Sequence, residues 1–282
     1  MTQITFPGLG IGPFDINDTA FAIGNFEIKW YGIIICLGMI LAYTYAWTRA
    51  KYEGIKTDDL LDFALALIVS GIVGARLYYI IFSLEDFVVK GTTFTDSLWQ
   101  TLGRMINIHN GGLAIYGGII AGAVAAIIVA KKKKIRLPIL FDVLAPSVMI
   151  GQLVGRWGNF MNAEAYGAVT EVPWRMGIQP YFGDSLLPGT YTEVHPTFLY
   201  ESLWNLIGFA VIAVFYKKKK FHGQWIAFYF AWYGLGRFFI EGLRQDSLYI
   251  GPLRVSQMLS AALCVAGIIL LVLGYIKRRK NA

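Results

Sequence analysis

Charged residues are scarce in this sequence. Of its 282 residues, 15% are charged and 56% are hydrophobic, and the mean hydropathy is +0.54. Soluble domains usually carry roughly a quarter charged residues, so the deficit argues against a water-soluble surface. A spanning helix needs about 20 mostly apolar residues. The chain is therefore long enough for roughly six to eight spans with modest loops, and it leaves no room for a large soluble domain.

Cysteine and histidine are also rare, which argues against several kinds of catalytic site. The two cysteines, Cys36 and Cys264, lie inside apolar segments, where a thiol packs as a small hydrophobic group. Three scattered histidines make no convincing metal site. The sequence also lacks a zinc-protease HExxH pattern, a Gly-x-Ser-x-Gly elbow and a nucleotide-binding glycine loop. We expect no metal, no cofactor and no nucleophile supplied by the protein.

Seven apolar segments can be marked along the chain. They lie near 30–47, 60–82, 112–130, 137–154, 196–216, 225–240 and 255–276. Pro196 suits the first turn of its helix, where a missing N–H costs nothing. We therefore predict an all-α integral membrane protein with about seven transmembrane helices.

Basic residues cluster after every second apolar segment. The clusters are Arg49, Lys51 and Lys56; Lys131–Lys134 with Arg136; Lys217–Lys220; and Lys277–Lys280. Cytoplasmic loops carry an excess of Lys and Arg, so this alternation predicts an N-terminus outside and a C-terminus in the cytoplasm. Clusters at the ends of apolar runs are not the basic stripe of a nucleic-acid surface. The net charge of +7 therefore does not indicate nucleic acid.

No internal repeat or low-complexity segment divides the chain, so we predict one membrane domain over residues 1–282. Its two longest loops, near 83–110 and 157–195, fall on the outer side in this topology. We expect them to form a small extracytoplasmic head over the outer ends of the helices.

Three arginines lie within or at the outer ends of apolar segments: Arg76, Arg156 and Arg237. A charge at the bilayer centre costs at least about 2.5 kcal/mol. Such residues are kept where they line a wet cavity or meet an anion, and the planar guanidinium suits a phosphate group.

Further polar side chains surround two of these arginines in the sequence. Asn159, Asn162 and Glu164 follow Arg156 in a run rich in glycine. These residues favour phosphate binding, and the alternative is a helix cap with a structural ion pair. Tyr233, Arg237 and Glu241 are spaced by four, so they form one stripe on a helix. Here the alternative is an ion pair that only fixes helix packing.

Three weaker candidates stand where apolar segments begin. Tyr31 and Tyr116 are aromatic residues at predicted membrane interfaces, which is an ordinary place for them. His195 precedes Pro196, where it either caps the helix or contacts a substrate.

These residues stand in motifs that resemble the prolipoprotein diacylglyceryl transferase family. The resemblance covers nearly the whole chain and rests most specifically on Gly-Arg-x-Gly-Asn-Phe-x-Asn-x-Glu-x-x-Gly over 155–167. The other motifs are Trp30-Tyr31-Gly32, Gly74-Ala75-Arg76-Leu77, His195-Pro196-x-x-Leu199-Tyr200-Glu201 and Tyr233…Arg237…Glu241-x-x-Arg244-Gln245. Where some members carry histidine between glycine pairs, this chain has Tyr116.

The resemblance implies a bacterial enzyme of the cytoplasmic membrane whose active site faces the extracytoplasmic side. It would transfer the diacylglyceryl group of phosphatidylglycerol to the lipobox cysteine of a prolipoprotein, forming a thioether and releasing glycerol phosphate. The expected partners are phosphatidylglycerol, the prolipoprotein signal peptide and membrane lipid. The catalytic candidates are Arg156, Arg237, Tyr116, Glu241 and His195, and the candidates for phosphatidylglycerol binding are Arg156, Asn159, Asn162, Glu164, Gly167, Tyr31, Arg76 and Tyr233.

In the mechanism that these residues suggest, the substrate thiolate attacks the glycerol carbon next to the phosphate. We expect Arg156 and Arg237 to clamp the phosphate and stabilise the departing charge. Asn159 and Glu164 would fix the head group, and Tyr116 or His195 would assist proton removal. A lipid or anion transporter is the main alternative, although transporters normally show repeats and broken helices near the midplane. A structural assembly factor of the membrane is the third possibility.

Overall fold

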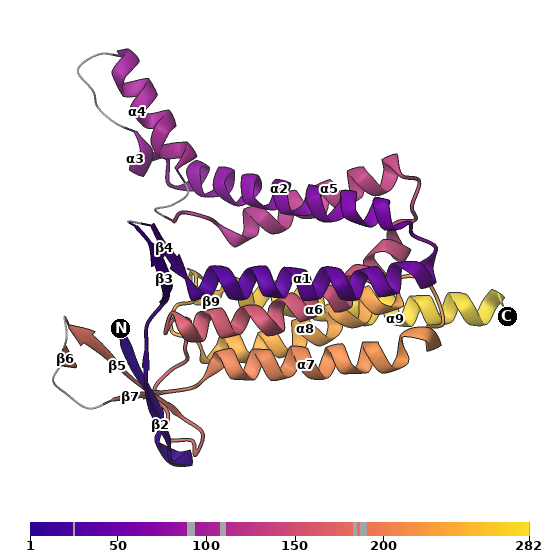
Figure 1. Ribbon diagram of the computed structural model, residues 1–282. Coiled ribbons are helices and arrows are strands. Elements are labelled where there is room, and N and C mark those ends of the chain that lie inside the picture. Colours follow the sequence, from indigo (N-terminus) through magenta and orange to yellow (C-terminus); the bar gives the residue numbers. More distant parts are fainter. Residues whose placement is uncertain (25, 89–93, 108–110, 183–184, 187–190, 282) are drawn as a thin grey trace. The chain divides into compact units, whose positions relative to one another are not determined.

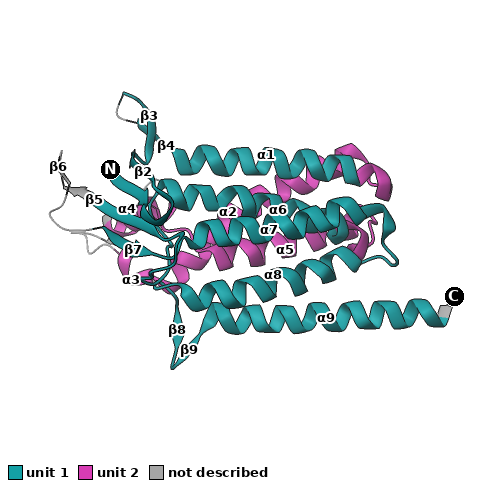
Figure 2. Cartoon of the chain, turned by 90° about the horizontal axis from the view of Figure 1, so that it is seen from below, with its two compact units in different colours: residues 1–49, 141–282 teal, residues 50–140 magenta. Residues whose placement is uncertain are grey.

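The computed structural model describes residues 1–24, 26–88, 94–107, 111–182, 185–186 and 191–281. The chain folds as two compact units (Figure 2). Unit 1 consists of Met1–Arg49 and Phe141–Ala282, and unit 2 of Ala50–Leu140. The chain therefore leaves unit 1 after its first helix and returns to it at Phe141.

Unit 2 is built on two long apolar helices that pack along each other, α2 (Thr57–Phe82) and α5 (Ile115–Lys132). Glycines let their backbones approach, because a Cβ on Gly74 would lie 2.7 Å from the carbonyl oxygen of Gly117. The shorter elements of this unit are the 3-10 helix η2 (Lys51–Glu53), α3 (Leu84–Phe87) and α4 (Phe94–Ile106).

Unit 1 contains a bundle of long helices (Figure 1). They are α1 (Trp30–Ala50), α6 (Leu137–Met161), which enters the unit at Phe141, α7 (Thr197–Phe215), α8 (Gln224–Leu243) and α9 (Val255–Asn281), with the short 3-10 helices η1 (Pro7–Leu9) and η3 (Tyr216–Lys218). Helices α8 and α9 pack side by side along their length. Small residues allow this contact, since a Cβ on Gly234 would lie 2.6 Å from the carbonyl oxygen of Ser260.

A buried carboxylate on α6 fixes the start of α8. Asp142 has no exposed surface and accepts hydrogen bonds from the backbone N–H groups of Gly223 and Trp225, both at 2.8 Å. Lys219 Nζ lies 3.2 Å from the same carboxylate. The first N–H groups of a helix lack partners within the helix and attract negative charge. Asp142 therefore satisfies the end of α8 and ties it to α6.

A small antiparallel sheet forms the head of unit 1. Its strands are β1 (Thr2–Phe6), β2 (Ile11–Ile16), β5 (Met176–Phe182), β6 (Ser185–Leu186) and β7 (Thr192–Val194), in the order β2-β1-β5-β6 with β7 also paired to β5. The register places Ile4 opposite Ile178, and both are buried with Val194 and Phe198, so the sheet packs onto the first turn of α7. Two hairpins complete the strands: β3 (Thr19–Ile23) with β4 (Phe26–Lys29), and β8 (Tyr249–Ile250) with β9 (Leu253–Arg254).

The head differs in composition from the one expected from the loops. The N-terminal residues contribute two of its strands, β1 and β2. Hydrophobic patterning did not predict these strands, because the stretch is short and rich in glycine and proline. The loop near 83–110 carries α3 and α4 in unit 2, and its contribution to the head stays a prediction. The fold is thus mostly helical with a small sheet, rather than all-α.

Six helices of the described residues are long and apolar enough to cross a membrane. They are α1, α2, α5, α6, α7 and α9, and they identify the chain as a multi-pass membrane protein. The segment predicted near 225–240 forms α8, whose Arg237, Glu241 and many aromatic rings lower its hydropathy below that of the other six. Helix α6 also continues past its predicted end at 154 to Met161, so that the first part of the glycine-rich run is helical.

Substitution of two glycines of α2 tests the contact with α5. In Gly74→Ala the new Cβ would lie 2.7 Å from a backbone oxygen of α5, so we expect a destabilisation of about 1–3 kcal/mol. Gly71→Ala is the matched control, because its Cβ would lie 4.0 Å from the nearest atom of α5. Thermal unfolding in detergent should show a lower Tm for Gly74→Ala alone. Equal Tm values for the two variants would contradict the close approach.

Candidate functional site

The polar site begins at the end of α6. Arg156 and Asn159 lie on one face of this helix, and Arg156 Nη1 donates to Asn159 Oδ1 at 3.1 Å. Just beyond the helix, Ala163 and Ala165 adopt positive φ angles of 50° and 58°. These left-handed residues reverse the chain, so that Glu164 returns toward Asn159.

Glu164 binds the two asparagines of the run. Asn159 Nδ2 donates to Glu164 Oε1 at 2.9 Å, and Asn162 Nδ2 donates to the same oxygen at 3.3 Å. The Asn159 amide is oriented by its neighbours, since its oxygen faces a guanidinium and its nitrogen a carboxylate. Arg156, Asn159 and Glu164 therefore form one chain of polar contacts that leads from the helix to an exposed carboxylate.

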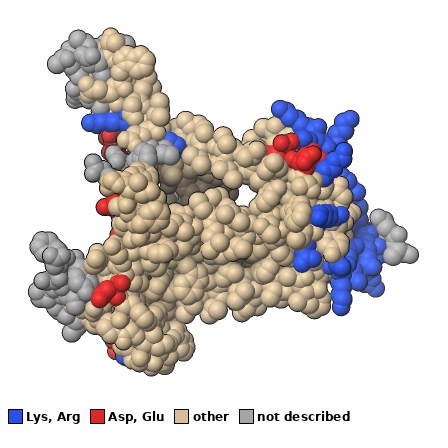
Figure 3. All heavy atoms as spheres, viewed as in Figure 1, with Lys and Arg blue, Asp and Glu red and all other residues tan. Residues whose placement is uncertain are grey.

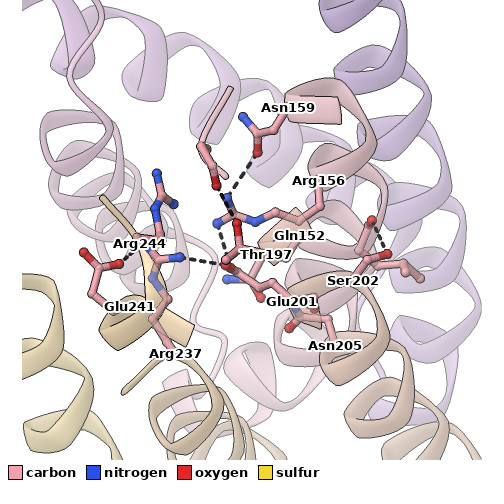
Figure 4. A network of polar contacts seen from close by, with 12 residues as sticks. Gln152, Arg156, Asn159, Thr197, Glu201, Ser202, Asn205, Arg237, Glu241 and Arg244 are labelled. Carbon is pink, nitrogen blue, oxygen red and sulfur yellow. Dashed lines mark hydrogen bonds and ion pairs between the residues drawn. The ribbon is translucent and has the colours of Figure 1, made fainter. Parts of the chain in front are cut away.

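A carboxylate of α7 joins the arginines of α6 and α8 (Figure 4). Glu201 Oε1 lies 2.6 Å from Arg156 Nη2, and Glu201 Oε2 lies 2.7 Å from Arg237 Nη1. Arg237 Nη2 lies 2.5 Å from Glu241 Oε2, one turn along α8. We call these four residues, Arg156, Glu201, Arg237 and Glu241, the ion cluster.

The cations of the ion cluster are more open than its anions. The side chains of Arg156 and Arg237 are 20% and 13% exposed, whereas those of Glu201 and Glu241 are 2% and 3% exposed. The carboxylates are thus buried behind the arginines, whereas both arginine side chains keep some accessible surface. A guanidinium has five N–H donors, and the contacts above use two on each arginine. The arrangement can therefore bind an anion without releasing its carboxylates.

Tyr233 stands one turn before Arg237 on α8 and continues the polar face of that helix. Its ring stacks on Tyr229 with centroids 5.5 Å apart, and Gln152 Nε2 of α6 donates to the Tyr229 hydroxyl at 3.0 Å. The predicted stripe of tyrosine, arginine and glutamate on α8 is confirmed by these positions, and it faces polar groups of α6 and α7.

Gly167 and His195 meet where the loop after α6 passes the start of α7. Gly167 N–H donates to the His195 carbonyl at 2.9 Å, and a Cβ on Gly167 would lie 2.7 Å from the Cβ of His195. Gly167 is thus required by close packing. The Tyr200 hydroxyl accepts from Trp174 Nε1 at 2.7 Å and lies 3.1 Å from His195 Nδ1.

The His195 imidazole is held in its neutral form. Partial burial lowers its pKa below the ordinary value of 6.5. His195 Nδ1 and the Tyr200 hydroxyl form one hydrogen bond, in which the tautomer of the imidazole decides which of the two donates.

Tyr31 packs against the α6 end that carries the site. It lies in the first turn of α1, and a Cβ on Gly158 would be 2.8 Å from Tyr31 Cδ2. Gly158 therefore allows the tyrosine ring to lie against α6, two residues beyond Arg156.

Arg76 and Tyr116 belong to unit 2. Arg76 directs its N–H donors at five backbone carbonyls: those of Arg104, Met105, Asn107, Gly111 and Gly112, at 2.6–2.8 Å. No N–H of this guanidinium is left for an anion. Tyr116 lies in the first turn of α5, beside the close contact of Gly117 with α2.

Within unit 1 the structure brings together most of the predicted site residues. The polar network contains Arg156, Asn159, Asn162, Glu164, Arg237 and Glu241, with Tyr233 beside it. Glu201, which joins the two arginines, belongs to one of the family motifs but is not among the predicted site residues. The sequence did offer a signal for Glu201. It is a carboxylate within the apolar segment near 196–216, and a buried charge needs a partner.

Comparison with known proteins gives a consistent family. The family model described as prolipoprotein diacylglyceryl transferase matches residues 18–273. A phosphatidylglycerol–prolipoprotein diacylglyceryl transferase of Finegoldia magna is 44% identical over 256 residues, which cover 90% of this chain and 94% of the relative. Relatives with the same name from Streptococcus pneumoniae (strain JJA) and Streptococcus agalactiae serotype Ia are 44% and 42% identical, over 94% and 91% of this chain and 96% and 95% of their own.

Removal of Glu201 tests whether this carboxylate holds the two arginines. Glu201→Ala leaves two partly buried guanidinium groups without their shared partner, and we expect a loss of about 3–5 kcal/mol of unfolding free energy. Leu203→Ala is the control, since Leu203 lies on the same helix with 48% of its surface exposed. Unfolding of both variants in detergent measures the difference. A Glu201→Ala protein as stable as Leu203→Ala would show that the carboxylate is not required.

Proposed function

Because the chain belongs to the prolipoprotein diacylglyceryl transferase family, we propose that its ion cluster receives the head-group phosphate of phosphatidylglycerol. The chain is a phosphatidylglycerol–prolipoprotein diacylglyceryl transferase, and it performs the first step of lipoprotein maturation. Its substrates are phosphatidylglycerol and a prolipoprotein.

The observation that carries the proposal is the convergence of Arg156 and Arg237 on one carboxylate. Glu201 holds the guanidinium groups from two helices at 2.6 and 2.7 Å, which fixes how far apart they lie. Their remaining N–H donors suit the oxygens of a phosphate, for which arginine forms paired, charge-assisted hydrogen bonds. Because the arginines are already held in place, little side-chain freedom is lost when the lipid binds.

The reaction needs stabilisation of a leaving anion rather than a protein nucleophile. The cysteine thiolate of the prolipoprotein attacks the glycerol carbon that bears the phosphate, so a C–S bond forms as the C–O bond breaks. Negative charge grows on the departing glycerol phosphate, and the positions of Arg156 and Arg237 suit stabilisation of that charge. The diacylglyceryl group stays on sulfur as a thioether.

The chain of contacts from Arg156 to Glu164 suits recognition of the glycerol head group. Asn159 and Glu164 present amide and carboxylate groups beside the guanidinium, and a glycerol hydroxyl can donate to the exposed carboxylate. Asn162 and Tyr233 lie next to this chain and complete the polar lining that we assign to the lipid.

Proton removal from the substrate thiol requires a base or a positive field. A cysteine thiol has a pKa near 8.5, and the arginines favour its thiolate. Of the two candidate bases, His195 is neutral because burial lowers its pKa, so its unprotonated ring nitrogen can accept a proton. Tyr116 is the other candidate, and the contacts of the two side chains favour neither of them as the base.

The membrane topology is part of the proposal. We infer that α8 crosses the membrane as the seventh span, because it packs along α9 over its length. Lysines follow α7 and lie in the last turns of α9, and in Figure 3 blue spheres gather where α9 ends. The ion cluster lies toward the opposite ends of α6, α7 and α8 from those lysines. The positive-inside rule then places the cluster at the extracytoplasmic side.

Arg156 variants test the phosphate site directly. Purified protein is incubated with phosphatidylglycerol and a lipobox peptide, and the mass gain of one diacylglyceryl group on cysteine is measured. Arg156→Ala should reduce the rate at least about 100-fold, the scale seen when a donor to a developing anion is removed. Arg156→Lys keeps the charge but loses the planar fork, so we expect an intermediate rate.

The control for these variants is Arg175→Ala. Arg175 pairs with Glu193 in the head at 2.5 Å and has no contact with the ion cluster, so its loss should leave the rate within a few-fold of wild type. An Arg156→Ala protein with wild-type turnover would overturn the phosphate site while leaving the family assignment intact.

Tyr116→Phe and His195→Gln separate the candidate bases. Unchanged turnover in Tyr116→Phe removes that hydroxyl as the base. If His195 acts, its lowered pKa keeps it deprotonated at neutral pH, and the rate should fall only as the pH drops below 6.5. His195→Gln should then abolish this acidic fall together with most of the rate. A pH profile unchanged by His195→Gln would exclude a role for its titration.

A further inference from the structure

Helix α4 of unit 2 divides its surface into an apolar and a polar side. The apolar face of α4 consists of Leu98, Trp99, Leu102, Met105 and Ile106, and the polar side carries Ser97, Gln100, Thr101 and Arg104. At 100° per residue the apolar face covers an arc of about 120°. A two-sided helix of this kind must bury its apolar face against something.

The apolar face is open within the described residues of unit 2. Leu98, Trp99, Leu102 and Ile106 are 44%, 68%, 38% and 78% exposed. A contiguous row of large exposed apolar side chains is typical of a surface that meets lipid or another protein. The polar function assigned above does not use this surface.

The length of α4 excludes a spanning role. Its 13 residues extend over about 20 Å, whereas the hydrocarbon core is about 30 Å thick. Short helices with separate polar and apolar sides lie in the plane of the interface, with the apolar side about 5–10 Å below the head groups.

Arg76 of α2 fixes the position of the C-terminal end of α4. Its Nε donates to the Met105 carbonyl at 2.8 Å, and its Nη2 donates to those of Arg104 at 2.8 Å and Asn107 at 2.6 Å. The last carbonyls of a helix lack partners and carry partial negative charge, so a guanidinium satisfies them well. The same guanidinium lies over the Phe87 ring at 5.0 Å and so also contacts α3. We call Arg76 and the carbonyls that it binds the anchor.

Two glycines complete this anchor on the other side of Arg76. The carbonyls of Gly111 and Gly112 both accept from Nη1 at 2.8 Å, and both residues have positive φ angles, of 82° and 79°. A Cβ on Gly112 would lie 2.5 Å from Arg76 Nη1. The chain therefore needs glycine here to bring its carbonyls to the arginine.

The position of Arg76 along α2 places this anchor at a membrane boundary. Arg76 stands about 29 Å along the helix from Thr57, at 1.5 Å per residue, which is close to the thickness of the hydrocarbon core. Beyond it, Ile81 and Phe82 at the end of α2 are 69% and 71% exposed. Exposed apolar side chains are thus found both on α4 and in the last turn of the helix to which Arg76 ties it.

We propose that α4 lies in the membrane interface with its apolar face in lipid, and that Arg76 is the positioning residue that holds it there. The partner is the lipid of the leaflet in which α2 ends, the outer leaflet in the topology above. Lipid is favoured over a protein partner because Arg76 ties the end of α4 to a helix that is long and apolar enough to span the membrane. Because all five N–H donors of Arg76 meet backbone carbonyls, we propose this positioning role in place of the lipid-binding role that the resemblance implied.

Site-directed spin labels on the full chain test the position of α4. In a Cys36→Ala/Cys264→Ala background, single labels are placed by Trp99→Cys, Ile106→Cys and the polar-side control Gln100→Cys, in nanodiscs of phosphatidylcholine and phosphatidylglycerol. We expect labels at 99 and 106 to collide more with oxygen than with a water-soluble nickel chelate, and the label at 100 to show the reverse.

Two results would overturn the lipid contact. Labels at 99 and 106 as open to the nickel chelate as that at 100 would place α4 in water. Labels at 99 and 106 shielded from both reagents would show that protein, such as a second copy of the chain or a peptide, covers the face. The measurement needs no turnover, so a failure of the phosphate-site proposal leaves it interpretable.

Two further variants test the anchor. Arg76→Lys keeps the charge but cannot reach five carbonyls, and Gly112→Ala places a methyl group against the guanidinium. Each should shift the label at 106 toward the nickel chelate by several-fold in relative collision rate, while Gly71→Ala should leave it unchanged. Folding is checked by the unfolding transition of the same samples. Unaltered accessibility in both anchor variants would refute the role of Arg76.

Discussion

The shared carboxylate of Glu201 is the constraint on which the site depends. Two guanidinium groups on neighbouring helices repel each other, and in the low dielectric of a membrane protein that repulsion is weakly screened. Glu201 accepts one hydrogen bond from each, at 2.6 and 2.7 Å, and its own burial is compensated by both cations. Removal of Arg156, Glu201 or Arg237 leaves an unbalanced charge among the other two. The positions of the two arginines therefore depend on how α6, α7 and α8 pack together.

Two buried carboxylates join the same helices at their two ends. Asp142 links the start of α6 to the start of α8 and to Lys219, and Glu201 links α7 to Arg156 near the end of α6 and Arg237 near the end of α8. Between them, glycines set the close contacts, as Gly234 does between α8 and α9. Unit 1 is thus a bundle held by charge at both ends and by close packing between, which suits a site that must keep two cations at a fixed separation.

Arginines in apolar segments have more than one use, and their surroundings decide which. The contacts among the described residues use two N–H donors on each of Arg156 and Arg237, and we propose that the remaining donors meet an anion. Arg76 gives all its donors to backbone carbonyls at the end of α4 and at the two glycines shortly before α5. The sequence pattern treats the three alike because each is a charge in an apolar run. Only the partners distinguish a ligand site from an internal support.

The sequence alone determined the long helices, because a run of apolar residues has few stable structures in lipid other than a helix. It also determined the family, and it identified the Arg156 run and the α8 stripe, since spacing of three and four residues places side chains on one face. The tertiary structure decided which groups from different helices meet. The role of Glu201, the pairing of the N-terminal strands with β5 and the support given by Arg76 all rest on contacts between residues far apart in the chain, where local periodicity carries no information.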